Sequence, residues 1–116
     1  MKKVECIIHS QKVAELYEAL LDFDVWGVTE IPVKGCGRQK GYYEEDKWGD
    51  KKRKIRVLPF KKVEFVVKDK LVEPLIELIL KTVRTDSMGD GKIFVYPCED
   101  AIRISDGERG TKAISK

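Results

Sequence analysis

Residues that build metal centres and disulfide frameworks are scarce in this chain. Its 116 residues include three cysteines and a single histidine, His9. Cys6, Cys36 and Cys98 lie far apart and follow no paired metal-ligand spacing, so we expect neither a structural zinc site nor any other metal site. Cys6 and Cys98 fall within apolar strand patterns, which predicts that both are small core residues.

Long hydrophobic runs and a strong charge of one sign are also absent. No apolar stretch approaches the roughly 20 residues that span a bilayer. The N-terminus runs directly into a strand pattern without a signal-peptide core, which predicts a cytoplasmic protein that does not insert into a membrane. The 23 basic and 20 acidic residues give a net charge of +3, too small a surplus to indicate nucleic-acid binding by itself.

The chain does contain an alternation of strand and helix patterns. Strands are predicted at 3–9, 28–33, 60–68 and 93–98. Apolar residues at helical spacing follow the first and third strands: Val13, Leu16, Tyr17, Leu20 and Leu21, then Val72, Leu75, Ile76, Ile79, Leu80 and Val83. The order predicts one α+β domain over residues 1–116, with a ferredoxin-like βαββαβ fold and a four-stranded antiparallel sheet.

Two details of these strands bear on how the sheet is used. Pro32 predicts an edge position or a bulge for its strand. The nearly unbroken apolar run at 93–98 predicts burial on both sides, or burial of one side against another subunit. Because two helices cover only one sheet face, we expect subunits to pack sheet against sheet.

A long polar stretch, residues 36–58, separates the second and third strands. It contains several glycines and the basic run 51–54. Loops of this length in small domains are usually functional or disordered. The sequence leaves two interpretations open, a solvated β-hairpin extension and an arm that contacts a ligand or partner.

A glycine-rich turn precedes the last strand, with Gly89, Asp90, Gly91 and Lys92 in succession. Glycine lets backbone N–H groups approach a phosphate closely, and lysine adds a cation. Asp90 indicates a tight turn held by its own side chain. Alone, such a motif is more often only a turn.

Three motifs together resemble a known family. They are Val-Lys-Gly-Cys-Gly-Arg-Gln-Lys-Gly at 33–41, Thr-Asp-Ser-Met-Gly-Asp-Gly-Lys-Ile-Phe-Val at 85–95, and Ala-Ile-Arg-Ile-Ser-Asp-Gly-Glu-Arg-Gly at 101–110. The chain resembles the PII signal-transduction proteins over nearly its whole length. The resemblance implies a homotrimer that binds ATP or ADP in clefts between subunits. It also implies a T-loop, here about 37–57, that docks on a target protein of nitrogen metabolism, and a C-terminal segment at 99–116.

The resemblance also implies which residues bind the nucleotide. The phosphate-binding cations match Arg38, Lys92 and Arg103, and the backbone cradle matches Gly89, Asp90 and Gly91. Gly35 and Gly37 shape the facing wall, with Gln39 beside them. The residues around adenine and ribose match Gly27, Val28, Thr29, Glu64 and Val66. Ser105 stands where the family commonly has a second arginine, so a preference for ADP or AMP over ATP is plausible.

Two further departures concern effectors and partners. Phe60 replaces a lysine that pairs with 2-oxoglutarate in many members. This argues against 2-oxoglutarate and its associated magnesium, although Gln39, which supports that arrangement, is retained. The loop is longer than usual and lacks the apical tyrosine that is modified in some members. Its expected partner-binding residues are Tyr42, Tyr43, Trp48, Lys51, Lys52 and Arg53, with Trp48 alternatively packing back onto its own loop.

Other functions remain open as alternatives. A PII-like regulator of a transporter for metal efflux or inorganic carbon would sense ADP or AMP without 2-oxoglutarate. Catalysis is not expected, because no Walker motif and no nucleophile–base pair is present. A nucleic-acid module is disfavoured, since the strand at 93–96 lacks interleaved basic and aromatic residues.

Overall fold

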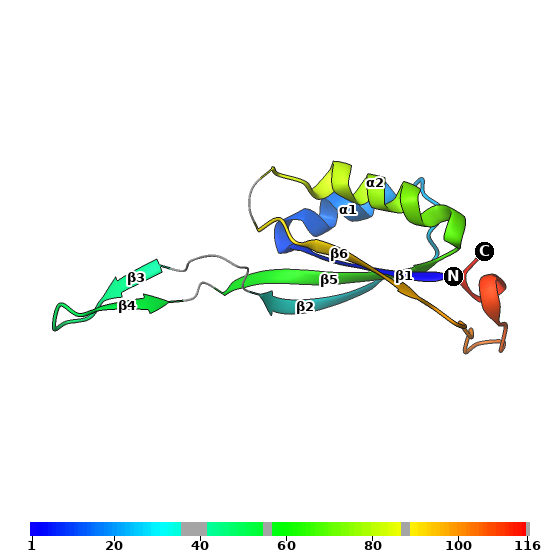
Figure 1. Cartoon of the computed structure of the whole chain (residues 1–116). Helices are drawn as coiled ribbons and strands as arrows, with labels where there is room; N and C mark the ends of the chain where they lie inside the picture. The colour runs from blue at the N-terminus through cyan, green and yellow to red at the C-terminus, as the bar shows by residue number, and fades with distance from the viewer. Residues whose placement is uncertain (36–41, 55–56, 87–88, 116) are drawn as a thin grey trace.

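Two helices lie on one face of a four-stranded antiparallel sheet (Figure 1). The computed structural model describes residues 1–35, 42–54, 57–86 and 89–115. In chain order the elements are β1 (Lys2–His9), α1 (Val13–Leu20), β2 (Thr29–Gly35), β3 (Tyr42–Glu45), β4 (Lys51–Lys54), β5 (Leu58–Val67), α2 (Val72–Val83) and β6 (Lys92–Pro97). Short 3-10 turns precede the two helices, and a third, η3 (Gly110–Ile114), lies near the C-terminus. The predicted α+β ferredoxin-like architecture is confirmed.

The strands follow the order β2-β5-β1-β6. Thr29 pairs with Glu64, Glu64 with Glu5, and Glu5 with Phe94, which fixes the register across the whole sheet. As Pro32 predicts, β2 is an edge strand. β6 forms the other edge.

The core lies between the sheet and the helices. Its most deeply buried side chains come from alternate positions of β1 and β5 and from one stripe of each helix: Val4, Cys6, Ile8, Val63, Phe65, Leu16, Leu75 and Ile79. Burial raises the pKa of the Cys6 thiol to about 11, so this cysteine stays protonated at neutral pH. Cys6 is therefore a core residue, as predicted.

Several predictions about burial are wrong. Leu21 is 81% exposed, because α1 ends at Leu20 and the chain leaves the helical stripe there. Leu80 is 36% exposed and lines a cavity together with Ile8 and Ile93. Cys98 lies just beyond β6 and is only partly buried, with its thiol donating to the Asp100 carbonyl at 3.2 Å. Strand β6 is not buried on both faces within one chain, since Val95 is 44% exposed.

The stretch between β2 and β5 forms a hairpin of its own, which we call the arm (residues 42–54). Its strands β3 and β4 make a separate two-stranded sheet that projects beyond the end of the main sheet (Figure 1). The molecule is consequently 64 Å long but only 27 Å and 21 Å in its other dimensions. Its radius of gyration, 18.3 Å, exceeds the roughly 13 Å expected of a compact chain of this length. Of the two interpretations of this stretch, the hairpin extension describes its form.

The helices are short. None in the described ranges combines the length and the apolar character needed to cross a bilayer.

Candidate functional site

One cavity of about 330 Å³ brings together five of the residues predicted to surround adenine and ribose. Gly27, Val28 and Thr29 enter it from the start of β2, and Glu64 and Val66 enter it from β5. They meet because Thr29 and Glu64 are direct partners in the β2–β5 register. Glu64 and Val66 share a face of β5, since strand side chains alternate.

The same cavity contains residues that the sequence reasoning missed. They are Lys3, Trp26, Phe65, Ala113 and Ile114. The Lys3 ammonium lies 3.2 Å from a Glu64 carboxylate oxygen, so Lys3 balances the charge of the predicted site residue. Trp26 directly precedes Gly27 in the sequence, so its place beside a predicted site residue could have identified it. Nothing local in the sequence predicts that Ala113 and Ile114, from η3, reach this cavity.

A second cavity, also about 330 Å³, is lined by Asp90, Gly91 and Lys92 at the start of β6. Gly91 has φ +107°, and a Cβ there would lie 1.7 Å from the Ile7 carbonyl oxygen. The chain can therefore press against β1 at this point only because residue 91 is glycine.

The side chain of Asp90 closes its own loop, as the sequence predicts. Its carboxylate accepts a hydrogen bond from the Thr85 backbone N–H at 2.7 Å and another from the Thr85 hydroxyl. Gly89, with φ +90°, lies between these groups in the chain. These two hydrogen bonds tie Asp90 to Thr85.

The predicted residues that the structure describes fall into two sets, which line separate cavities or adjoin them. We call Gly35, Gly89, Asp90, Gly91 and Lys92 the arm-end cluster, since Gly35 ends β2 where the arm begins. We call Gly27, Val28, Thr29, Glu64, Val66 and Arg103 the terminal cluster. Gly35 pairs with Leu58, six residues before Glu64 on β5, which corresponds to about 20 Å along the strand. Thr29 and Lys92 lie on opposite edge strands, three strand spacings or about 14 Å apart across the sheet, with Lys92 in register with Ile31.

Arg103 is engaged by the C-terminal segment. Its guanidinium pairs with Asp106 at 2.7 Å and donates to the carbonyl oxygens of Lys112, at 2.6 Å, and Ser115, at 3.2 Å. These bonds hold η3 beside the terminal cluster. Ser105 is exposed in the adjoining turn.

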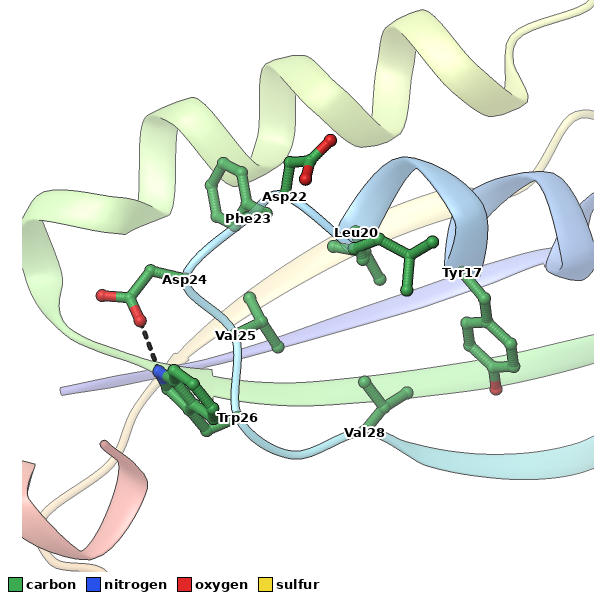
Figure 2. Close-up of a pocket in the computed structure, with 9 residues that line it drawn as sticks. Tyr17, Leu20, Asp22, Phe23, Asp24, Val25, Trp26 and Val28 are labelled. Atoms are coloured by element: carbon green, nitrogen blue, oxygen red, sulfur yellow. Dashed lines mark hydrogen bonds between the residues drawn. The ribbon is translucent and has the colours of Figure 1, made fainter. Parts of the chain in front are cut away.

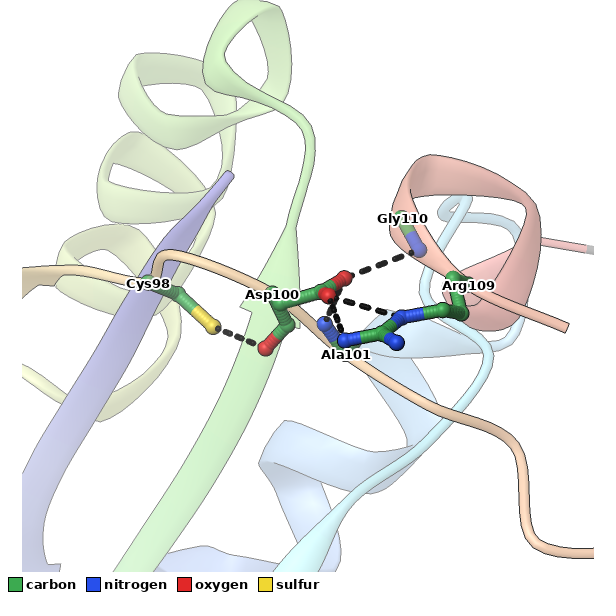
Figure 3. Close-up of polar contacts among 5 residues, drawn as sticks. All are labelled: Cys98, Asp100, Ala101, Arg109 and Gly110. Carbon is green, nitrogen blue, oxygen red and sulfur yellow. Dashed lines mark hydrogen bonds and ion pairs between the residues drawn. The ribbon is translucent and has the colours of Figure 1, made fainter. Parts of the chain in front are cut away.

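A second ion pair closes the C-terminal segment at its base (Figure 3). Asp100 receives two hydrogen bonds from the Arg109 guanidinium, at 2.9 Å and 2.6 Å, and one each from the backbone N–H groups of Ala101 and Gly110. The Arg109 side chain, followed by these backbone donors, lowers the pKa of Asp100. The Asp100 carboxylate therefore links the start of the C-terminal segment to Arg109 and Gly110.

An aromatic pair lies where the arm joins the main sheet, near Gly35 and Phe60, and we call this place the root of the arm. Phe60 is 8% exposed, and its ring stacks on that of His9 with 4.9 Å between centroids. A Cβ on Gly35 would lie 3.4 Å from the same ring. Three other predicted residues at this root, Gly37, Arg38 and Gln39, lie outside the described residues.

The tip of the arm is a tight turn that displays Trp48. Asp46 accepts hydrogen bonds from the backbone N–H groups of Trp48, at 2.8 Å, and Asp50, at 2.9 Å. Trp48 is 78% exposed, and its ring is approached by the Lys47 ammonium at 5.3 Å. The alternative that Trp48 packs back onto the loop is wrong. Of the other expected partner residues, Lys51 and Lys52 are exposed, while Tyr42, Tyr43 and Arg53 lie on the two arm strands.

No group of three histidine, cysteine or acidic side chains in the described part of the chain is placed to hold a metal ion.

Comparison with known proteins assigns the family. The family model of the nitrogen regulatory protein P-II matches residues 1–108. The chain belongs to the P-II family. A nitrogen regulatory protein P-II of Rhodospirillum rubrum is 46% identical over 114 residues, which cover 98% of this chain and all of the relative. The corresponding protein of Haemophilus influenzae is 44% identical over the same length.

The solved structures agree. A structure of B. subtilis GlnK superposes with a TM-score of 0.80 at 34% identity, covering 97% of both chains. The resemblance drawn from the three motifs is thus confirmed, and this P-II chain is a signal-transduction regulator rather than an enzyme.

Proposed function

We propose that this P-II protein binds adenine nucleotides between the subunits of a homotrimer and reports their identity to a target protein through its arm. The observation that carries the proposal is that the predicted nucleotide residues line two separate cavities of one chain, which share no residue. We infer that one nucleotide contacts both sets of residues by lying between two copies of the chain.

The chemistry of the two clusters is complementary. The arm-end cluster offers glycine backbone and the Lys92 cation, which suit phosphates. The terminal cluster offers an apolar cavity with one carboxylate, which suits a base and a sugar. Arg103 would add a second cation from the neighbouring copy. Each cluster is then half of a site.

Exposed apolar side chains support assembly. Tyr96 on β6 is 43% exposed, and in the C-terminal segment Ile102 is 53% and Ile104 is 99% exposed. On the sheet face opposite the helices, η3 reaches the part that holds Glu64 and Val66, while Tyr96 on the same face stays exposed. In the proposed trimer, neighbouring copies would cover these side chains.

Two residues favour ADP or AMP over ATP acting with 2-oxoglutarate. Ser105 cannot supply the second guanidinium that a third phosphate would use. Phe60 is packed on His9 where a lysine would be needed for a dicarboxylate. We therefore propose that 2-oxoglutarate and its magnesium are not part of the signal.

The arm is coupled to the site through its root. Gly35 ends β2, and the predicted phosphate ligand Arg38 follows within the same stretch of chain. A ligand shifts the arm by its difference in affinity for two arm states, typically about 1–3 kcal/mol. Trp48 and the neighbouring lysines would then meet a target, in nitrogen metabolism by analogy with the relatives.

Calorimetry with ATP, ADP and AMP, each with and without 2-oxoglutarate and magnesium, tests this proposal, with light scattering for the assembly state. We expect a trimer, one nucleotide per chain, and affinities that 2-oxoglutarate does not change. A lone protomer that ignores every nucleotide at millimolar concentration would contradict it.

A second candidate, regulation of a transporter outside nitrogen metabolism, is favoured by Phe60, because this residue removes the link to 2-oxoglutarate. Capture of membrane proteins on immobilised protein in the presence of ADP, AMP or ATP separates the two candidates. Retention of a metal or inorganic-carbon transporter would support the second, and retention of an ammonium channel or a nitrogen-assimilation enzyme the first.

A further inference from the structure

An exposed tryptophan lies between the terminal cluster and a larger cavity. Trp26 is 54% exposed. It lines the cavity that holds Gly27, Thr29 and Glu64, and it also lines a cavity of about 640 Å³ between the end of α1 and the start of β2 (Figure 2). Val28 is the other residue common to both. The indole therefore forms a wall of the proposed base-binding pocket.

The orientation of this ring is fixed by its own loop. The indole N–H donates to the Asp24 carboxylate, as Figure 2 shows. The loop itself is held by backbone hydrogen bonds from Phe23 to Leu20, at 3.0 Å, and from Val25 to Phe23, at 2.8 Å. An aromatic side chain whose orientation is fixed before the ligand binds loses little conformational freedom on binding.

The remaining lining suits a flat heteroaromatic ring. Ala113 and Ile114 contribute aliphatic surface from η3, which Arg103 holds through the Lys112 and Ser115 carbonyls. The Lys3–Glu64 ion pair supplies the polar groups. Sites for small molecules commonly combine apolar and aromatic walls with a few polar groups that fix orientation.

We propose that Trp26 stacks on the base of the bound nucleotide and is a main determinant of its affinity. This inference rests on the proposed function and adds a contact residue to the same site. Removing an aromatic partner from a stacked base weakens binding by about ten- to a hundredfold. The contribution belongs to the base alone, so ligands that carry only phosphates should not depend on it.

The chain offers a direct spectroscopic test, because it contains only two tryptophans. In Trp48→Phe, Trp26 is the sole indole, and ADP should quench or shift its emission in a saturable titration. Calorimetry should show an ADP affinity ten- to a hundredfold weaker in Trp26→Leu, near wild type in Trp26→Phe, and unchanged in Trp48→Phe. Inorganic tripolyphosphate, which has no base, should bind Trp26→Leu and wild type equally.

The outcomes separate this inference from the proposed function. If ADP binds wild type and Trp26→Leu equally and leaves the emission of Trp48→Phe unchanged, the stacking inference is wrong while the nucleotide site stands. If Trp26→Leu loses tripolyphosphate and ADP alike while Trp26→Phe keeps both, its defect is structural and stacking is again contradicted. If wild type binds no nucleotide, the proposed function fails first.

Discussion

At the scale of single residues, Glu5 is a buried carboxylate on the sheet face opposite the helices. It is 7% exposed, accepts a hydrogen bond from the Tyr96 hydroxyl at 2.8 Å and pairs with the Lys62 ammonium at 3.0 Å. The Tyr96 and Lys62 hydrogen bonds lower the pKa of Glu5 below its usual 4.5. The carboxylate form therefore stabilises the folded state.

Replacing this carboxylate should lower stability in a pH-dependent way. We expect Glu5→Gln to lose about 1–2 kcal/mol of unfolding free energy at neutral pH. Because folding lowers the pKa, this contribution is present above pH 4.5 and is lost as the pH falls through the lower folded value. Urea denaturation across this pH range should show the difference in unfolding free energy between wild type and Glu5→Gln becoming smaller as the pH falls. Glu15→Gln, at an exposed ion pair with Lys12, should change little. If the stability difference between wild type and Glu5→Gln stays constant as the pH falls below 4.5, the stabilising role of the Glu5 carboxylate is contradicted.

Two glycines of the proposed site should differ in how strongly an added methyl group lowers the stability of the fold. Gly91→Ala places a Cβ against the Ile7 carbonyl at a φ of +107°, so we expect a loss of about 3 kcal/mol or more. Gly27→Ala meets nothing within 4 Å, so its stability should stay within about 1 kcal/mol of wild type. Thermal and urea unfolding check both. Equal stability of the two variants would show that β6 does not press on β1.

At the scale of elements, alternation and helical spacing predicted the four strands of the main sheet and both helices, and Pro32 predicted the edge position of β2. The same patterns failed where an element ends, as at Leu21 and Cys98, because periodicity carries no signal for the last residue that packs. The terminal cavity was predicted in part. Val28 and Val66 were assigned to it through the family motifs, whereas the contribution of Ile114 depends on contacts of Arg103 with backbone carbonyls far along the chain. Such contacts leave no local pattern.

The arm should be separable from the folded body. Within the described parts of the chain its two strands pair only with each other, and its tip is closed by its own hydrogen bonds around Asp46. Replacing residues 42–54 with a short glycine-serine linker should therefore change the unfolding free energy by less than about 1 kcal/mol, because loop length costs little. Urea denaturation measures this. A loss of several kcal/mol would mean that the arm stabilises the body.

At the scale of the whole molecule, the central claim is that two copies complete each site. Lys92 belongs to the arm-end cluster and Arg103 to the terminal cluster. Neither cluster contains both the proposed phosphate-binding turn and the proposed base-binding cavity. A variant that damages one cluster therefore leaves the other intact for a neighbour.

Mixing two defective variants tests this claim most directly. Lys92→Ala and Arg103→Ala should each bind ADP weakly, and calorimetry on trimers refolded from an equal mixture should recover full-affinity sites. Random cyclic trimers give roughly one restored site in four. If the mixture binds no better than either variant alone, although both chains are shown to assemble together, both halves belong to one chain and the account is wrong.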